Sequence, residues 1–139
     1  MKPPEEVKRE IVCQWLQKAE EDFHLAEHLA GENIPYLNAI GSHAQQAAEK
    51  FLKAFLVQHQ IEFPKTHDLD KLLDLIVSAD NKLADSLRCS TDLTPYGADI
   101  RYPGDLPELT KGDAIRAVDL ARKVRAAVFE KIGVDTDEK

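Results

Sequence analysis

The sequence lacks the features that mark several classes of protein. It holds only two cysteines among 139 residues, and they belong to no CxxC or Cys/His pattern. Reduced or buried thiols in a cytoplasmic protein are therefore the expectation for Cys13 and Cys89. No apolar run approaches the roughly 18 residues of a membrane span. The N-terminus shows no apolar stretch of the kind found in signal peptides. We therefore expect a cytoplasmic protein without a membrane segment.

Basic residues are outnumbered as well. The net charge is −7, from 25 acidic and 18 basic residues. A broad, non-specific nucleic-acid binder depends on neutralising phosphates, so this balance disfavours that class. A local basic groove is still compatible with this net charge, because the segment from Lys111 to Lys131 contains six basic and three acidic residues. A solvated helix face with mixed charges accounts for the same segment.

Helical periodicity is what the sequence does contain, over most of its length. Apolar residues recur every three or four positions, and no strand-like alternation, repeat or low-complexity linker is present. We predict helices over about residues 5–30, 36–60, a short stretch after Thr66, 80–93 and 110–133. Short loops between them predict an all-α fold, an up-and-down antiparallel bundle of four to five helices. One domain would cover residues 5–133, followed by a polar tail at 134–139.

Local signals predict the helix ends and the buried faces. Thr66 is expected to cap the short helix, Pro95 to end the fourth helix, and Thr110 with Asp113 to form a capping box at the last. The predicted core consists of the apolar stripes of these helices: Trp15, Ala19, Phe23, Ala26 and Ala30; Ile40, Ala44, Ala47, Ala48, Phe51 and Phe55; Leu69, Leu72, Leu73, Ile76 and Val77; Leu83 and Leu87; Ala114, Ala117, Val118, Ala121, Val124 and Val128.

Polar residues follow one flank of the second predicted helix. His43, Gln46, Lys50 and Lys53 have offsets of three, seven and ten residues, which place them in one line beside the apolar face. Such a stripe is typical of a groove between helices or of an oligomer seam. Alternatively, the long side chains only cross the edge of the core and keep their polar ends in water.

Other histidines have simpler explanations. His24 and His28 are four residues apart, as two zinc ligands on a helix can be, but no third ligand is in view. Both point away from the apolar face, which indicates surface residues. His67 lies at a helix start beside Asp68 and Asp70, where capping and local hydrogen bonds explain it. We predict no metal site and no cofactor.

Residues 96–105, YGADIRYPGD, combine turn formers with Tyr96, Arg101 and Tyr102. Arg101 could donate two parallel hydrogen bonds to a phosphate or carboxylate, and either tyrosine could stack on a base. Equally, Arg101 could pair with an acid on a neighbouring helix while Tyr102 and Pro103 pack as an apolar plug. The residues alone leave both interpretations open.

Several segments together resemble the HEPN family (higher eukaryotes and prokaryotes nucleotide-binding domain). The resemblance covers about residues 12–132 and is carried by WLQKAEEDFHLAEHL, SHAQQAAEKFLKAFL, the TH-DL-LL element at 66–73 and the Tyr…Arg-Tyr-Pro element at 96–103. It implies a bundle of four or five helices, commonly a homodimer. It also implies a gene often found beside a minimal nucleotidyltransferase, in a toxin–antitoxin or nucleotide-handling pair. Many members are metal-independent endoribonucleases.

The sequence departs from the ribonuclease signature of that family, an arginine followed by four to six residues and then a histidine. Positions five to seven after Arg101 are Leu106, Pro107 and Glu108, and no histidine follows His67. The family's acid–base histidine is therefore not carried over to any residue. Tyrosine, whose pKa is ordinarily about 10, is a poor replacement. Serine-hydrolase and phosphate-loop motifs are absent too.

The sequence therefore predicts a cytoplasmic, dimeric HEPN-like module that binds a nucleotide or RNA, a minimal nucleotidyltransferase partner, or both. No residue is assigned a catalytic role, and two alternatives stay open. One is an endoribonuclease that uses His43 with Arg101. The other is a structural dimeric partner protein in which Arg101 is a buried ion-pair residue. The predicted ligand-binding residues are His43, Gln46, Lys50, Lys53, Tyr96, Arg101 and Tyr102.

Overall fold

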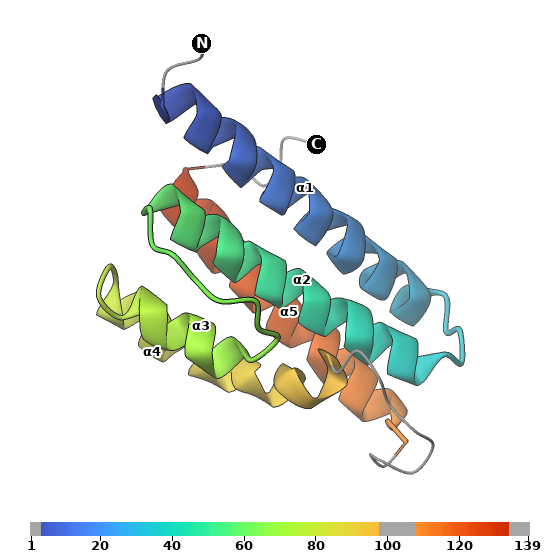
Figure 1. The fold of residues 1–139 in the computed structure, drawn as a ribbon. Helices are drawn as coiled ribbons and strands as arrows, with labels where there is room; N and C mark the ends of the chain where they lie inside the picture. The colour runs from blue at the N-terminus through green and yellow to red at the C-terminus, as the bar shows by residue number, and fades with distance from the viewer. Residues whose placement is uncertain (1–3, 98–107, 134–139) are drawn as a thin grey trace.

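A computed structural model of the protein describes residues 4–97 and 108–133. Most of these residues lie in helices (Figure 1). The elements in chain order are α1 (Pro4–Gly31), α2 (Leu37–Gln58), α3 (Leu69–Ile76), α4 (Asn81–Ser86), the 3₁₀-helix η1 (Arg88–Gly97) and α5 (Lys111–Ile132). The predicted all-α bundle is confirmed.

Helix α2 lies at the centre of the bundle. It packs against α1 on one side, against α3 and η1 on the other, and along α5 (Figure 1). α1 and α2 run antiparallel, and the first turns of α1 extend beyond the end of the bundle. The reason is length, because α1 has 28 residues whereas α2 and α5 have 22 each. Side chains on α2 can therefore meet residues from nearly every other element.

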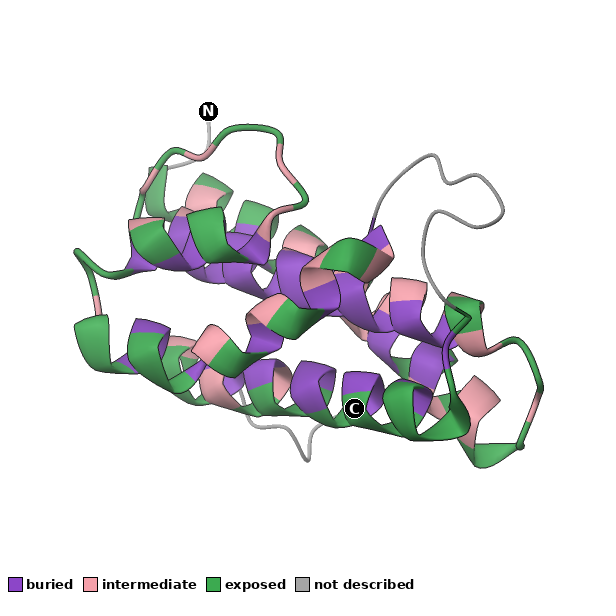
Figure 2. Ribbon diagram, turned by 90° about the horizontal axis from the view of Figure 1, so that it is seen from below, coloured by how far each residue is buried: buried purple, intermediate pink, exposed green. Residues whose placement is uncertain are grey.

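Burial follows from this arrangement, and Figure 2 shows buried residues along the inner faces of the helices. Phe23, Phe51 and Phe55 are each at most 2% exposed. Burial of one such ring contributes about 1.5–3 kcal/mol. Four alanines of α2, namely Ala44, Ala47, Ala48 and Ala54, are fully buried as well, and their small side chains allow the neighbouring helices to approach closely. The predicted stripes of α2 and α5 are confirmed in full, because all their named residues are buried.

The buried stripes of α1 and α3 differ from the prediction. In α1 the buried face includes Val12 and Leu16, whereas Trp15 and Ala30 are only partly buried against the core. Trp15 lies at the edge of the stripe, where its ring meets Phe63 with ring centroids 6.1 Å apart. Val77 is 37% exposed because it is the C-cap residue of α3, one position past the helix. Its predicted burial is wrong.

The N-terminal cap predicted for α3 differs from the structure, and the one predicted for α5 agrees with it. The cap predicted at Thr66 is wrong: Asp68 caps α3, and its carboxylate accepts from the backbone N–H of Asp70 at 3.0 Å. Thr66 instead accepts from the N–H of Asp68 at 3.1 Å, one step earlier. At α5 the capping box is confirmed, with the Thr110 hydroxyl accepting from the N–H of Asp113 at 3.0 Å.

The fourth predicted helix is also different. α4 ends at Ser86, and the chain continues as the 3₁₀-helix η1 with Pro95 inside it. The prediction that Pro95 ends a helix is therefore wrong. Proline fixes φ near the values that a 3₁₀-helix uses, so Pro95 fits there without strain. This places Tyr96 and Gly97 on η1 rather than in a loop.

Cys13 and Cys89 are both exposed and free, so the buried alternative is wrong. Within residues 4–97 and 108–133, every helix is too short or too polar to cross a membrane.

Candidate ligand-binding flank of helix α2

Two of the predicted site residues share one carboxylate. Asp22 of α1 has Oδ1 3.0 Å from Nδ1 of His43, and its Oδ2 accepts from Nζ of Lys50 at 2.6 Å. His43 and Lys50 are two turns apart on α2 and so face the same side. Their side chains are 31% and 23% exposed, so solvent reaches both. We call Asp22, His43 and Lys50 the outer cluster.

The outer cluster fixes the proton on the imidazole. An ionised aspartate only accepts hydrogen bonds, so Nδ1 of a neutral His43 must be the N–H donor toward Asp22. Nε2 of His43 is then the acceptor, on the part of the ring turned away from that carboxylate. The Lys50 ammonium uses one of its three N–H donors on Asp22. The cluster thus combines a cation with a hydrogen-bond acceptor.

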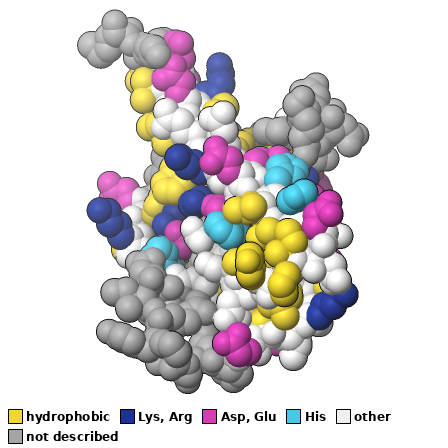
Figure 3. Space-filling model, turned by 90° about the vertical axis from the view of Figure 1, so that its right-hand side faces the viewer, with side chains coloured by type: hydrophobic (Ala, Val, Ile, Leu, Met, Phe, Trp, Pro, Cys, Tyr) yellow, Lys and Arg dark blue, Asp and Glu magenta, His cyan; other side chains and the backbone are white. Residues whose placement is uncertain are grey.

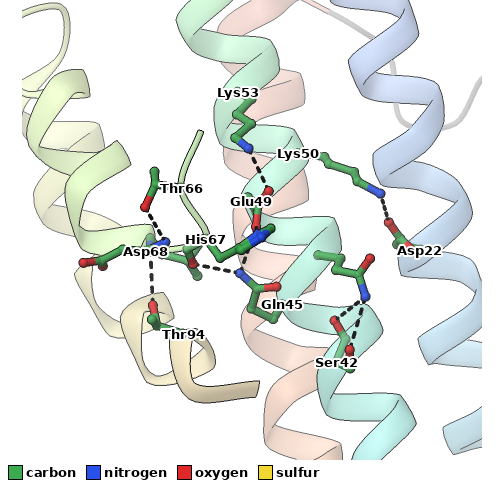
Figure 4. A network of polar contacts seen from close by, with 12 residues as sticks. Asp22, Ser42, Gln45, Glu49, Lys50, Lys53, Thr66, His67, Asp68 and Thr94 are labelled. Carbon is green, nitrogen blue, oxygen red and sulfur yellow. Dashed lines mark hydrogen bonds and ion pairs between the residues drawn. The ribbon is translucent and has the colours of Figure 1, made fainter. Parts of the chain in front are cut away.

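The fourth member of the stripe lies in a different environment. Lys53 donates to Oε2 of Glu49 at 2.8 Å, and the two side chains are only 8% and 6% exposed (Figure 4). Its ammonium also lies 5.5 Å from the ring centroid of Trp15 and 5.7 Å from that of Phe63. An ammonium covered by two rings and a carboxylate is not placed to meet a phosphate from solvent.

Glu49 holds further groups on its second oxygen. Its Oε1 accepts from Nε2 of Gln45 at 3.1 Å and contacts Nδ1 of His67 at 2.8 Å (Figure 4). The local explanation of His67 is therefore incomplete, because its ring reaches across to α2 while Asp68 caps α3. We call Gln45, Glu49, Lys53 and His67 the inner cluster. Its contacts hold the loop between α2 and α3 against the middle of α2.

Gln45 links the inner cluster to the end of η1. The side chain is fully buried, and its Nε2 also donates to the backbone oxygen of His67 at 3.0 Å. Among the described residues, its Oε1 has no hydrogen-bond partner. A Cβ at Gly97 would lie 2.2 Å from both Cδ and Oε1 of Gln45. Only glycine allows η1 to end in contact with this amide.

The residues on both sides of segment 98–107 rest on the first half of α2. A Cβ at Gly41 would lie 3.3 Å from the Tyr96 ring and 2.8 Å from Leu109. The Asn38 side chain donates to Glu108 at 3.1 Å and accepts from the N–H of Leu109 at 3.2 Å. The residues just before and just after this segment therefore both contact α2, at Gly41 and Asn38, which are two and five residues before His43 in the sequence. Arg101 and Tyr102 lie outside the described residues.

Tyr96 also lines a hollow between η1 and the start of α5. The hollow has a volume of about 390 Å³ and is lined by Thr91, Asp92 and Arg116, among others. At its rim Arg116 donates to Asp92 at 2.5 Å, and both side chains are more than half exposed. Tyr96 thus lies against Gly41 of α2 and also lines this polar hollow.

Gln46 and His24 have local partners. Gln46 donates to the backbone oxygen and hydroxyl of Ser42 at 3.4 Å and 3.2 Å, which folds its amide back onto α2. The ring nitrogens of His24 lie close to two carboxylates, with Nε2 at 3.3 Å from Glu20 and Nδ1 at 3.6 Å from Glu27. The described part of the chain contains no group of three or more side chains able to hold a metal ion.

Four of the six cations of α5 pair with acids from other elements: Arg116, Arg122, Arg125 and Lys131. Arg125 donates to both oxygens of Glu20, at 2.5 Å and 3.0 Å, and Arg122 donates to Glu27 at 3.1 Å. Burial raises the pKa of Glu27, but the hydrogen bond and charge of Arg122, together with His24, outweigh it and hold that pKa below its ordinary value. Figure 3 shows acidic and basic side chains interspersed on one face, beside an apolar patch. The mixed-charge interpretation fits these contacts.

Comparison with known proteins identifies the family of the chain. The HEPN domain model matches residues 12–132 of the chain. The chain belongs to the HEPN family. A crystal structure from Thermus thermophilus is similar to this HEPN domain, with 27% identity, a TM-score of 0.68, and coverage of 86% of this chain and 97% of that one. That of an archaeal HEPN homologue has 24% identity and a TM-score of 0.66, and covers 87% and 97%. No curated protein matches the sequence.

The sequence does not predict three residues that hold the two clusters of this HEPN domain together: Asp22, Gln45 and Glu49. For Glu49 a signal exists, because an acid four residues before Lys53 inside an apolar helix indicates an internal ion pair. For Asp22 there is none, because it meets its two partners only through the packing of α1 on α2.

Proposed function

We propose that this HEPN protein is the binding module of a two-component, toxin–antitoxin-like system. It binds a nucleotide or RNA along the exposed flank of α2, a minimal nucleotidyltransferase partner, or both. It acts in the cytoplasm as a homodimer. The observation that supports a ligand site is the solvent-exposed pair of His43 and Lys50, held side by side by Asp22. The residues that flank segment 98–107 contact the same helix at Asn38 and Gly41.

The proposed contacts follow from the chemistry of each side chain. Lys50 offers its remaining N–H donors to a phosphate, and Arg101 offers a second, two-donor contact. Tyr96 and Tyr102 supply rings on which a base can stack. Gln46 adds an amide on the same flank. Lys53 is left out of the ligand contacts, because its charge is neutralised by Glu49 inside the bundle.

Binding of a fluorescent short RNA and of mononucleotides, measured by anisotropy and calorimetry at several salt concentrations, tests the proposal. Arg101→Ala and Lys50→Ala should weaken binding, and Lys50→Ala should lower the salt slope by about one. Lys82→Ala removes the same charge from an exposed position on α4 and should leave binding unchanged. Equal binding by all variants, or none by the wild type, would contradict a direct ligand site.

The partner half of the proposal needs its own experiment. A nucleotidyltransferase encoded beside this gene should co-elute with the HEPN protein in size-exclusion chromatography after co-expression. Separate elution of the two at micromolar concentration would contradict the partnership. The same column measures whether the HEPN protein alone has the mass of a dimer.

A metal-independent endoribonuclease is the second candidate, and the Asp22–His43 pair favours it. A carboxylate on Nδ1 orients an imidazole so that Nε2 can accept a proton as a general base. Labelled RNA incubated with the protein in a chelator should then be cleaved. His43→Ala should abolish cleavage, and Asp22→Asn should slow it. RNA left intact by the wild type would remove this candidate.

A further inference from the structure

The outer cluster places a hydrogen-bond acceptor and a cation side by side. Oδ1 and Oδ2 of one carboxylate hold Nδ1 of His43 and Nζ of Lys50, at 3.0 Å and 2.6 Å. The two groups are therefore separated by little more than the carboxylate of Asp22. Because Asp22 accepts the N–H of His43, Nε2 of the neutral ring can only accept a hydrogen bond.

This pair of groups selects a particular chemistry in a ligand. A bare phosphate satisfies Lys50 but presents only acceptor oxygens to Nε2 of His43. A ligand that suits both groups has a hydroxyl donor next to an anionic oxygen. The ribose 2′-hydroxyl beside its 3′-phosphate is such a unit, and deoxyribose lacks the donor.

The charge of the surroundings strengthens this selection. Asp22 offsets the charge of Lys50, and four of the six cations of α5 are paired with acids from other elements, Glu20 and Glu27 among them. Attraction to phosphate alone is therefore weak on this surface, in line with the net charge of −7. A directional hydrogen bond then contributes a large share of whatever affinity the flank has.

We propose that His43 is a specificity-determining residue that accepts a hydrogen bond from a ribose 2′-hydroxyl. The protein consequently prefers ribonucleotide over deoxyribonucleotide backbones. This inference rests on the proposed binding function and names the feature of the ligand that it recognises. Asp22 is the positioning residue, because it fixes the donor and acceptor sides of the imidazole.

Three short single strands of one sequence test the inference: RNA, DNA and 2′-O-methyl RNA. The last keeps the ribose oxygen but removes its proton, so it isolates the donor role. The wild type should bind RNA about fivefold to tenfold more tightly than either other strand, as expected for one lost hydrogen bond. Anisotropy titrations at one salt concentration measure the three dissociation constants.

His43→Ala should bind all three strands alike, near the affinity of the wild type for DNA. His43→Gln retains an acceptor of similar reach and should keep part of the preference. The control is His28→Ala, which removes an exposed imidazole from α1 and should keep all of it. Equal wild-type affinity for RNA and 2′-O-methyl RNA, or a preference that survives in His43→Ala, overturns the inference while leaving the binding function standing. No binding of any strand overturns both.

Discussion

Asp22 and Glu49 each hold an imidazole on one oxygen and a lysine on the other, and both lysines come from α2. They differ in their surroundings. Lys50 of the outer cluster is 23% exposed, whereas Lys53 of the inner cluster is 8% exposed and lies under two aromatic rings. The same kinds of group can thus form a solvent-exposed binding surface or a buried ion-pair cluster that stabilises the fold. Spacing in the sequence does not distinguish them, and burial does.

The largest expected difference between the clusters is in stability. Lys53→Met leaves the carboxylate of Glu49 buried without its cation, and such a loss typically costs about 3–5 kcal/mol. Urea unfolding monitored by circular dichroism measures the change. The double variant Lys53→Met with Glu49→Leu removes both charges and should recover much of the loss. A double variant as unstable as the single one would show that the charges are not the cause.

The contact between Gly97 and Gln45 provides the next test. In Gly97→Ala the new methyl group would lie 2.2 Å from the amide of Gln45. Overpacking of this kind destabilises a protein by about 1–3 kcal/mol. Gly112→Ala is the matched control, because its Cβ would meet its nearest neighbour at 3.7 Å in the first turn of α5. There the substitution should leave stability unchanged or raise it, and thermal melting compares the two variants.

A weaker effect on folding is expected at the outer cluster. Asp22→Asn removes the charge that holds Lys50, in a pair that solvent reaches, so the free energy of unfolding should change by about 1 kcal/mol or less. DNA binding should become stronger, because Lys50 is no longer neutralised, whereas the preference for RNA should shrink, because Asp22 no longer fixes the acceptor side of His43. Urea unfolding together with anisotropy checks both. A loss of stability as large as that of Lys53→Met would make the outer cluster structural as well.

The smallest effect is expected outside both clusters, at the ion pair of Glu27 with Arg122. The pKa of Glu27 is lowered from 4.5 in the folded protein, so the pair stabilises fully above that pH. Its contribution is lost as the pH falls through the folded pKa. Arg122→Gln should therefore cost roughly a few tenths of a kcal/mol near neutral pH. The difference from the wild type, measured by urea unfolding, should disappear in acid, and a constant difference would contradict the pairing.

The sequence predicts the bundle well because its signals are local and repeated. The apolar stripe of α2, the capping box at Thr110 and the left-handed Gly133, with φ of 90°, all agree with their neighbours along the chain. The site is predicted only in part. His43 and Lys50 were found by spacing, but their partner Asp22 lies on another helix. Lys53 has the same spacing and a different role, because Trp15 and Phe63 cover it only after folding.

The exposed thiols have a practical consequence. Cys13 lies on α1 and Cys89 on η1, two elements that pack on different sides of α2, and neither is tied up in a disulfide. The native chain thus already carries two attachment points for maleimide dyes or spin labels. A distance measured between the probes would span the central helix. Its change on addition of RNA would report whether occupancy of the flank rearranges the helices, without any residue being introduced for the purpose.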